Sequence, residues 1–159
     1  SSKDYFISNG SSLFDDIIIE EKENNSRIIH EDDTFISFVP FFARWPYECH
    51  ILSKKSCERL ADFSTDEISL LANQIKIVNA CHNNLFSHKM EYVMLFHHSP
   101  CRENNGHYRF YIEFQPLYQL ANRPKKAAGI ERAGSFEFGS GTPESNAKDM
   151  IKVLQDFNL

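Results

Sequence analysis

Short apolar runs separated by polar turns fill the first third of the chain and predict strands over residues 16–21, 27–30, 34–39 and 49–53. The pairs Asn24-Asn25 and Asp32-Asp33 are typical of turns between them. Two later runs, residues 92–98 and 108–115, predict a fifth and a sixth strand. Because tight turns join the early strands, the sheet is expected to be antiparallel.

Two other stretches have helical spacing. Ser64 and Glu67 form a capping box, and the apolar positions that follow predict a helix over residues 65–85 with its apolar stripe on the sheet. His82 falls on that stripe and is interpreted as a packing residue rather than a ligand. Thr142-Pro143-Glu144 begins a closing helix. The pattern therefore predicts an α+β fold: an antiparallel sheet of about five to six strands with two helices packed on it, in a single domain over residues 1–159.

An aromatic run at residues 38–52, FVPFFARWPYECHIL, interrupts the strand pattern. Pro40 and Pro46 cannot donate to a strand ladder, so the strand must break between them. The density of aromatic residues is too apolar for an ordinary surface loop. On the residues alone, this run is predicted to be a buried strand corner.

The last predicted strand alternates cleanly, with Tyr108, Phe110, Ile112 and Phe114 on one face and Arg109, Tyr111, Glu113 and Gln115 on the other. The polar face is either solvated or lines a site. A neighbouring strand ends in His97-His98 and can bring one imidazole near Glu113. Such a pair can be a metal site, an acid/base pair or a simple hydrogen bond, and the spacing does not choose among them.

The long segment 120–141 holds a second candidate, Arg123-Pro124-Lys125-Lys126-Ala127-Ala128-Gly129-Ile130-Glu131. Lysines beside glycine can contact a phosphate, and a carboxylate can accept hydrogen bonds from sugar hydroxyls. Basic turns are common, so this signal is weak by itself. The chain carries no Walker loop, no GxSxG and no dinucleotide-binding GxGxxG pattern.

Composition narrows the function classes. The net charge of −5 argues against a general nucleic-acid binder, which needs a basic surface. No apolar run is long enough to span a bilayer. The four cysteines form no CxxC pair, so a zinc ribbon is not expected. We interpret them as free thiols in a reducing compartment and expect a cytoplasmic location.

Several stretches together resemble the second half of galactose-1-phosphate uridylyltransferases, members of the histidine-triad superfamily. The matching pieces follow in the same order: residues 39–50, Leu85-Phe86, YVMLFHHSP at 92–100, FYIEFQP at 110–116, Ala128-Gly129-Ile130-Glu131, and a helix headed by Pro143-Glu144. The resemblance implies a histidine-triad-like fold. It also implies a role in exchanging a uridylyl group between UDP-glucose and galactose-1-phosphate in galactose metabolism.

The resemblance also implies partners and site residues. In the family, the nucleophile is a histidine of a His-Pro-His motif in the first half; this chain has no such motif, so alone it is expected to be inactive. Lys125, Ala128, Ile130 and Glu131 match substrate-binding positions, often placed across a homodimer interface. His97 and Glu113 match ligands of a zinc or iron site. Tyr111 stands where many relatives have histidine, which puts that site in doubt.

Two alternatives stay open from the sequence. One is the corresponding half of an adenylyl-type nucleotidyltransferase or phosphorylase, because the base pocket lies mainly in the other half. The other is a non-catalytic, nucleotide-binding histidine-triad-like domain, favoured by Tyr111 and by the missing nucleophile. Saturable binding of hexose-1-phosphate distinguishes an enzyme half from a pure interaction module.

Overall fold

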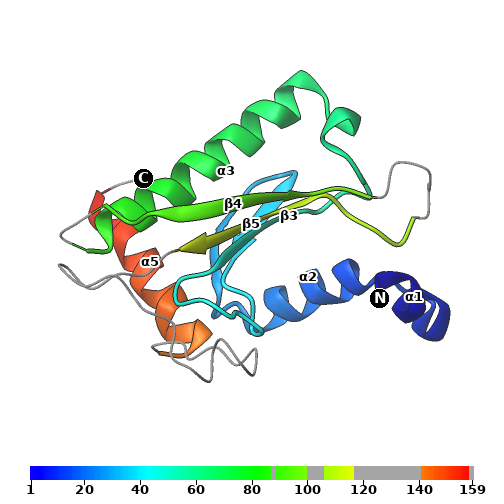
Figure 1. Ribbon diagram of the computed structural model, residues 1–159, viewed down its shortest axis with the longest axis horizontal. Coiled ribbons are helices and arrows are strands. Elements are labelled where there is room, and N and C mark those ends of the chain that lie inside the picture. The colour runs from blue at the N-terminus through cyan, green and yellow to red at the C-terminus, as the bar shows by residue number, and fades with distance from the viewer. Residues whose placement is uncertain (87–88, 100–105, 117–140, 158–159) are drawn as a thin grey trace.

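A computed structural model describes residues 1–86, 89–99, 106–116 and 141–157. Its centre is a five-stranded antiparallel sheet in the order β1-β2-β3-β5-β4 (Figure 1). The strands are β1 (Ile28–Glu31), β2 (Phe35–Phe38), β3 (Cys49–Ser53), β4 (Tyr92–His97) and β5 (Tyr111–Pro116). The helices are α1 (Ser2–Asn9), α2 (Leu13–Asn24), α3 (Thr65–Asn84) and α5 (Pro143–Phe157), with a short 3₁₀ turn η1 (Leu60–Asp62). The predicted α+β class is confirmed.

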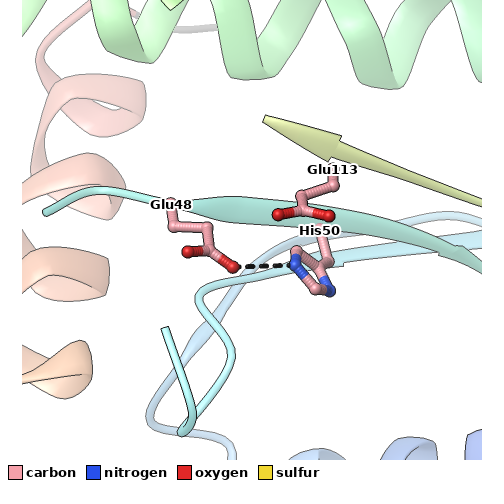
Figure 2. A group of neighbouring side chains, drawn as sticks. All are labelled: Glu48, His50 and Glu113. Carbon is pink, nitrogen blue, oxygen red and sulfur yellow. Dashed lines mark hydrogen bonds and ion pairs between the residues drawn. The ribbon is translucent and has the colours of Figure 1, made fainter. Parts of the chain in front are cut away.

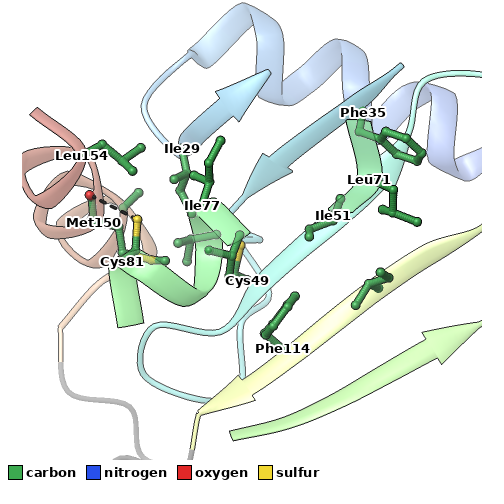
Figure 3. Close-up of a cluster of buried hydrophobic side chains, with 14 of the residues drawn as sticks. Ile29, Phe35, Cys49, Ile51, Leu71, Ile77, Cys81, Phe114, Met150 and Leu154 are labelled. Atoms are coloured by element: carbon green, nitrogen blue, oxygen red, sulfur yellow. Dashed lines mark hydrogen bonds between the residues drawn. The ribbon is translucent and has the colours of Figure 1, made fainter. Parts of the chain in front are cut away.

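Helices cover both faces of the sheet, with α3 on one side and α2 on the other (Figure 1). The larger core lies under α3 and α5, where side chains such as Leu71, Val78 and Met150 meet Ile51 and Phe114 from the strands (Figure 3). A smaller cluster lies under α2 and consists of Ile36, Phe38 and Leu52 with residues of the helix packed against it. The side chains of one strand therefore alternate between two apolar layers.

The prediction of a strand over residues 16–21 is wrong, because these residues belong to α2. The Ser12 hydroxyl accepts a hydrogen bond from the Phe14 N–H and begins the helix. Phe14, Ile17 and Ile18 then pack on the sheet, so tertiary contact overrides the strand preference of the β-branched residues. The expected turn at Asn24-Asn25 is the end of this helix, where Asn25 adopts a left-handed φ of 47°.

The two predicted helices are confirmed with nearly the expected bounds. In α3, the Ser64 side chain accepts from the Glu67 N–H and the Glu67 side chain accepts from the Ser64 N–H. His82 is fully buried, and its Nε2 lies 3.0 Å from the Tyr47 carbonyl oxygen, so its interpretation as a packing residue is confirmed. No helix within the described ranges combines the length and the apolar character needed to cross a bilayer.

The aromatic run breaks the strand as predicted, because β2 ends at Phe38 and β3 begins at Cys49. The predicted burial holds for Val39 but is wrong for Phe41 and Phe42, which are 59% and 45% exposed. Their rings contact each other edge to face, and Phe42 also contacts the ring of His50. The corner is thus divided: Phe42 lies beside His50 on the α2 face, whereas Val39 belongs to the main core and Ala43 and Tyr47 pack against that core.

The last strand is shorter than the sequence pattern predicts. Phe110, Ile112 and Phe114 face the main core as expected. Tyr108 precedes the first residue of β5 and does not share their face: its ring contacts Phe14 of α2 at a centroid distance of 5.3 Å. The predicted alternation therefore fails at Tyr108, which lies before the first residue of β5.

Candidate functional site

Three adjacent strands place polar side chains on the sheet face that α2 partly covers. In the strand register, His50 of β3 lies directly opposite Glu113 of β5, and His97 of β4 lies opposite Tyr111 of β5. Residues directly opposite in an antiparallel pair point to the same face. Glu48 precedes β3 by one residue and shares that face with His50, two positions later (Figure 2).

Glu113 is at the centre of this group. Its Oε2 lies 2.9 Å from His97 Nε2, and its Oε1 accepts a hydrogen bond from the Gln115 amide at 2.5 Å. The structure therefore brings together the His97 and Glu113 that the sequence singled out. His98 lies away from them, with its ring 5.2 Å from that of Phe110, so only one of the two histidines joins the polar face.

Glu48 and His50 form a second pair beside Glu113, with His50 Nε2 3.0 Å from Glu48 Oε1. Both residues are buried, at 2% and 8% exposure. The other carboxylate oxygen of Glu48 accepts the backbone N–H groups of Arg44 and Trp45 at 2.8 and 3.1 Å. Burial works to raise the pKa of Glu48, but the hydrogen bonds from His50 and the backbone outweigh it and hold this pKa below its usual value.

The potential ligand atoms of Glu48, His50 and Glu113 all lie within 4.8 Å of one another (Figure 2). Imidazole nitrogen and carboxylate oxygen are ligands that zinc and ferrous iron both accept. This group can hold a divalent metal, or it can remain a hydrogen-bonded cluster.

Tyr111 stacks beside the two histidines of the site. Its ring lies 4.2 Å from that of His97 at an interplanar angle of 7°, and 5.6 Å from that of His50 at 28°. Burial, together with the nearby Tyr108 and Glu113, raises the pKa of Tyr111 above its ordinary value, so the phenol stays neutral.

A cavity of about 280 Å³ adjoins the site under α1 and α2. His50 and Tyr111 line it together with aromatic and aliphatic side chains, among them Phe14, Phe38 and Tyr108. The polar group therefore opens onto an apolar space large enough for a small molecule.

The sequence pattern alone does not mark Glu48 and His50 as site residues. Their alternation, Glu-x-His, predicts that both side chains share one strand face, but only the register of β3 against β5 reveals that this face meets Glu113. The predicted substrate-binding residues Lys125, Ala128, Ile130 and Glu131 lie outside the described residues.

The sequence profile described as "Galactose-1-phosphate uridyl transferase, C-terminal domain" matches residues 1–125. This chain belongs to that family. The Thermotoga maritima galactose-1-phosphate uridylyltransferase is 33% identical over 133 residues, which are 82% of this chain and 42% of the relative. The Haemophilus influenzae galactose-1-phosphate uridylyltransferase is 32% identical over 136 residues, 84% of this chain and 39% of the relative. The chain thus spans about two fifths of the length of these relatives.

Solved structures agree with this assignment. A structure described as that of a uridylyltransferase superposes with a TM-score of 0.88 at 28% identity, covering 98% of this chain and 48% of that one. A Bartonella henselae Hit-like protein shares the fold alone, with a TM-score of 0.55 at 17% identity over 86% of this chain and 95% of that one. The uridylyltransferase C-terminal domain family and its histidine-triad-like fold, expected from the sequence, are both confirmed.

Proposed function

We propose that this chain is the C-terminal part of a hexose-1-phosphate uridylyltransferase that exchanges a uridylyl group between UDP-glucose and galactose-1-phosphate. The observation that carries the proposal is the family match over residues 1–125, joined by relatives above 30% identity that bear this enzyme's name. The uridylyl acceptor and donor are accordingly hexose-1-phosphate and a UDP-sugar.

Within that enzyme, the chain contributes binding rather than the nucleophile. Its 159 residues contain no His-Pro-His, so the histidine that forms the nucleotidyl intermediate belongs to the N-terminal half. We assign sugar-phosphate contacts to Lys125, Ala128, Ile130 and Glu131. A lysine ammonium can neutralise the hexose phosphate, and the Glu131 carboxylate can accept hydrogen bonds from sugar hydroxyls.

The N-terminal half and a second copy of the enzyme are the proposed protein partners. Among the described strands, β4 has a neighbour on one side only. Its Val93, Leu95 and Phe96 are 42%, 36% and 41% exposed. An apolar edge strand of this kind favours coverage by further protein. We also propose a cytoplasmic location, supported by Cys49, Cys57 and Cys81, which are free thiols.

We further propose that a zinc or iron ion is held on the α2 face, with His97 and Glu113 as ligands. Two imidazoles and two carboxylates gather there, which suits either metal. When bound, such an ion would supply a structural link between the strands. His97 and Gln115 hold the Glu113 carboxylate in place through its two oxygens.

Calorimetric titration of the chain with galactose-1-phosphate tests the assignment of the sugar contacts. We expect saturable binding that weakens at least about 10-fold in Lys125→Ala and in Glu131→Gln, since each removes a charge-assisted hydrogen bond. Lys148→Ala, on an exposed position of α5, is the matched control and should bind as the unmodified chain does. Equal affinity in all four proteins, or no binding at all, contradicts the assignment.

Intact-mass measurement after incubation with UDP-glucose tests whether the nucleophilic histidine lies outside this chain. The chain should keep its mass, because the nucleophilic histidine is elsewhere. A covalent uridylyl adduct on this chain would overturn that part of the proposal.

A further inference from the structure

A second cleft, with a volume of about 360 Å³, lies where the C-terminal parts of α3 and α5 meet at one end of the sheet (Figure 1). Asn84, the last residue of α3, and Phe86 line one side of it. Asp149 and Asp156 of α5 line another side, and Tyr47 reaches it from the corner before β3. We call it the α3–α5 cleft. Within the described residues, none of the metal ligands proposed above lines it.

Tyr47 is held in an uncommon backbone conformation at this cleft. Its φ is 61°, in the left-handed region that aromatic residues rarely adopt. Nε2 of the buried His82 lies 3.0 Å from the Tyr47 carbonyl oxygen, and the Tyr47 hydroxyl donates to Asp149 Oδ2 at 3.2 Å. Its ring meets that of Phe86 edge to face, at a centroid distance of 5.4 Å. Backbone strain of this kind persists only where surrounding contacts maintain it, and such residues cluster at ligand sites.

Hydrogen-bond acceptors predominate among the polar groups of the cleft. Asn84 Nδ2 donates to the Ala80 carbonyl at 2.8 Å, which leaves Oδ1 as the atom of this amide that can accept from a ligand. Asp149 accepts from Tyr47 with Oδ2 only, and Asp156 adds a second carboxylate. The last carbonyl groups of a helix also lack intrahelical donors, and its C-terminal end carries partial negative charge. The cleft therefore favours a ligand that donates several hydrogen bonds.

The charges at the cleft decide which class of donor fits. Lys152 stands one helical turn from both Asp149 and Asp156, so all three share one face of α5. Two carboxylates and one ammonium leave a net negative charge, which repels an anion, and the ammonium between them repels an amine. The two carboxylates lie about 10 Å apart along the helix axis, too far to share one metal ion. An uncharged ligand with several hydroxyl groups remains.

We propose that the α3–α5 cleft binds an uncharged monosaccharide in its ring form. Sugar hydroxyls donate to Asn84 Oδ1 and to the Asp149 carboxylate, and Lys152 donates to a sugar oxygen. The fixed ring of Tyr47 packs against the C–H face of the sugar, which buries apolar area that an open-chain polyol does not present. This inference goes beyond the proposed uridylyl transfer and does not depend on it, because the probe carries no phosphate.

NMR titration of isotope-labelled chain with D-galactose and with D-glucose tests the proposal. For at least one of the two sugars we expect saturable shifts of the amide signals of Asn84, Asp149 and Lys152, with a Kd on the order of 1 mM for so few contacts. Galactitol, the open-chain polyol, should give no saturable shift, and neither should spermidine or inorganic phosphate. Absence of saturation by both sugars overturns the proposal, as does tighter binding of galactitol, spermidine or phosphate at these residues.

Substitutions at the cleft separate loss of the ligand contacts from misfolding. Tyr47→Gly removes the ring but suits the left-handed φ, and it should raise the Kd for the sugar at least about 10-fold. Tyr47→Phe keeps the ring and should bind within about 3-fold of the unmodified chain. Asp149→Ala, at an exposed position outside the core, should weaken binding about 10-fold, whereas its exposed neighbour Lys148→Ala, the matched control, should not. Unchanged affinity in Asp149→Ala, or equal losses in Asp149→Ala and Lys148→Ala, overturns the proposal.

Discussion

The buried histidine of α3 makes the stability of this domain depend on pH. His82 is fully buried, and its Nε2 lies 3.0 Å from the Tyr47 carbonyl oxygen, while Nδ1 has no hydrogen-bond partner among the described residues. The rings of Tyr92 and Phe114 are its neighbours at 6.2 and 6.0 Å. Burial among these groups disfavours the imidazolium and lowers the pKa of His82 from 6.5 to about 4.

Proton linkage gives the direction and the size of this effect of pH on the free energy of unfolding. Between pH 6.5 and about 4, the unfolded chain binds a proton at His82 that the native protein does not. The free energy of unfolding therefore falls as the pH is lowered through this range. The full loss is about 3 kcal/mol, because each pH unit between the two pKa values is worth about 1.4 kcal/mol. At pH 5 about 2 kcal/mol is already lost, a large part of a stability of about 5–15 kcal/mol.

Urea unfolding at pH 7.5 and pH 5 measures this contribution when it is compared with His82→Gln. Glutamine keeps an N–H donor for the Tyr47 carbonyl but does not titrate. We expect the unmodified chain to lose about 2 kcal/mol more than the variant between these pH values. His98→Gln, at an exposed position, is the control and should follow the unmodified chain. Identical pH dependence in the unmodified chain and His82→Gln, or an NMR titration of His82 near pH 6.5, would refute the reasoning.

Three further changes test the packing of the domain, each by urea unfolding. Arg27→Met should lower the free energy of unfolding by about 3–5 kcal/mol, because it leaves the carboxylate of Glu21, 1% exposed, without its ion-pair partner. Glu144→Gln, on the exposed side of the same cluster, is the control and should lower it by under about 1 kcal/mol. Equal losses in the two variants would contradict this prediction. Ser64→Ala removes the cap of α3 and should cost about 1 kcal/mol; no change would mean that the cap contributes nothing. Phe114→Ala opens a void in the main core and should cost about 3–5 kcal/mol, and a cost under about 1 kcal/mol would place this ring outside it.

The sequence predicts most of the sheet and both long helices, because local periodicity and capping decide those elements. It fails at residues 16–21, where Ile17, Ile18 and Ile19 favour a strand by propensity. The helix α2 forms there because Phe14, Ile17 and Ile18 lie on one helical face and pack on the sheet. That contact is tertiary, so no local pattern reveals it.

The candidate site was predictable only in part. Alternation along the last strand and the position of His97 were enough to suggest the pairing with Glu113, which requires only that β4 and β5 be neighbours. Glu48 and His50 join the group through the pairing of β3 with β5, two strands that are far apart in sequence. Strand order does not follow from periodicity, so this half of the site needed the structure.

The ion cluster at Arg27 connects helices that lie on opposite faces of the sheet. Arg27 forms ion pairs with Glu21 of α2, on one face of the sheet, and with Glu144 at the start of α5. The helix α5 packs together with α3 on the opposite face. Arg27 thus links the helix layers on the two faces of the sheet at the start of the edge strand β1. Residues 117–140, which carry the proposed sugar contacts, join β5 to α5, so Arg27 anchors the far end of that connection. Loss of this one side chain would therefore free both helices from the start of β1 at once, because the same guanidinium ties α2 and α5 to it.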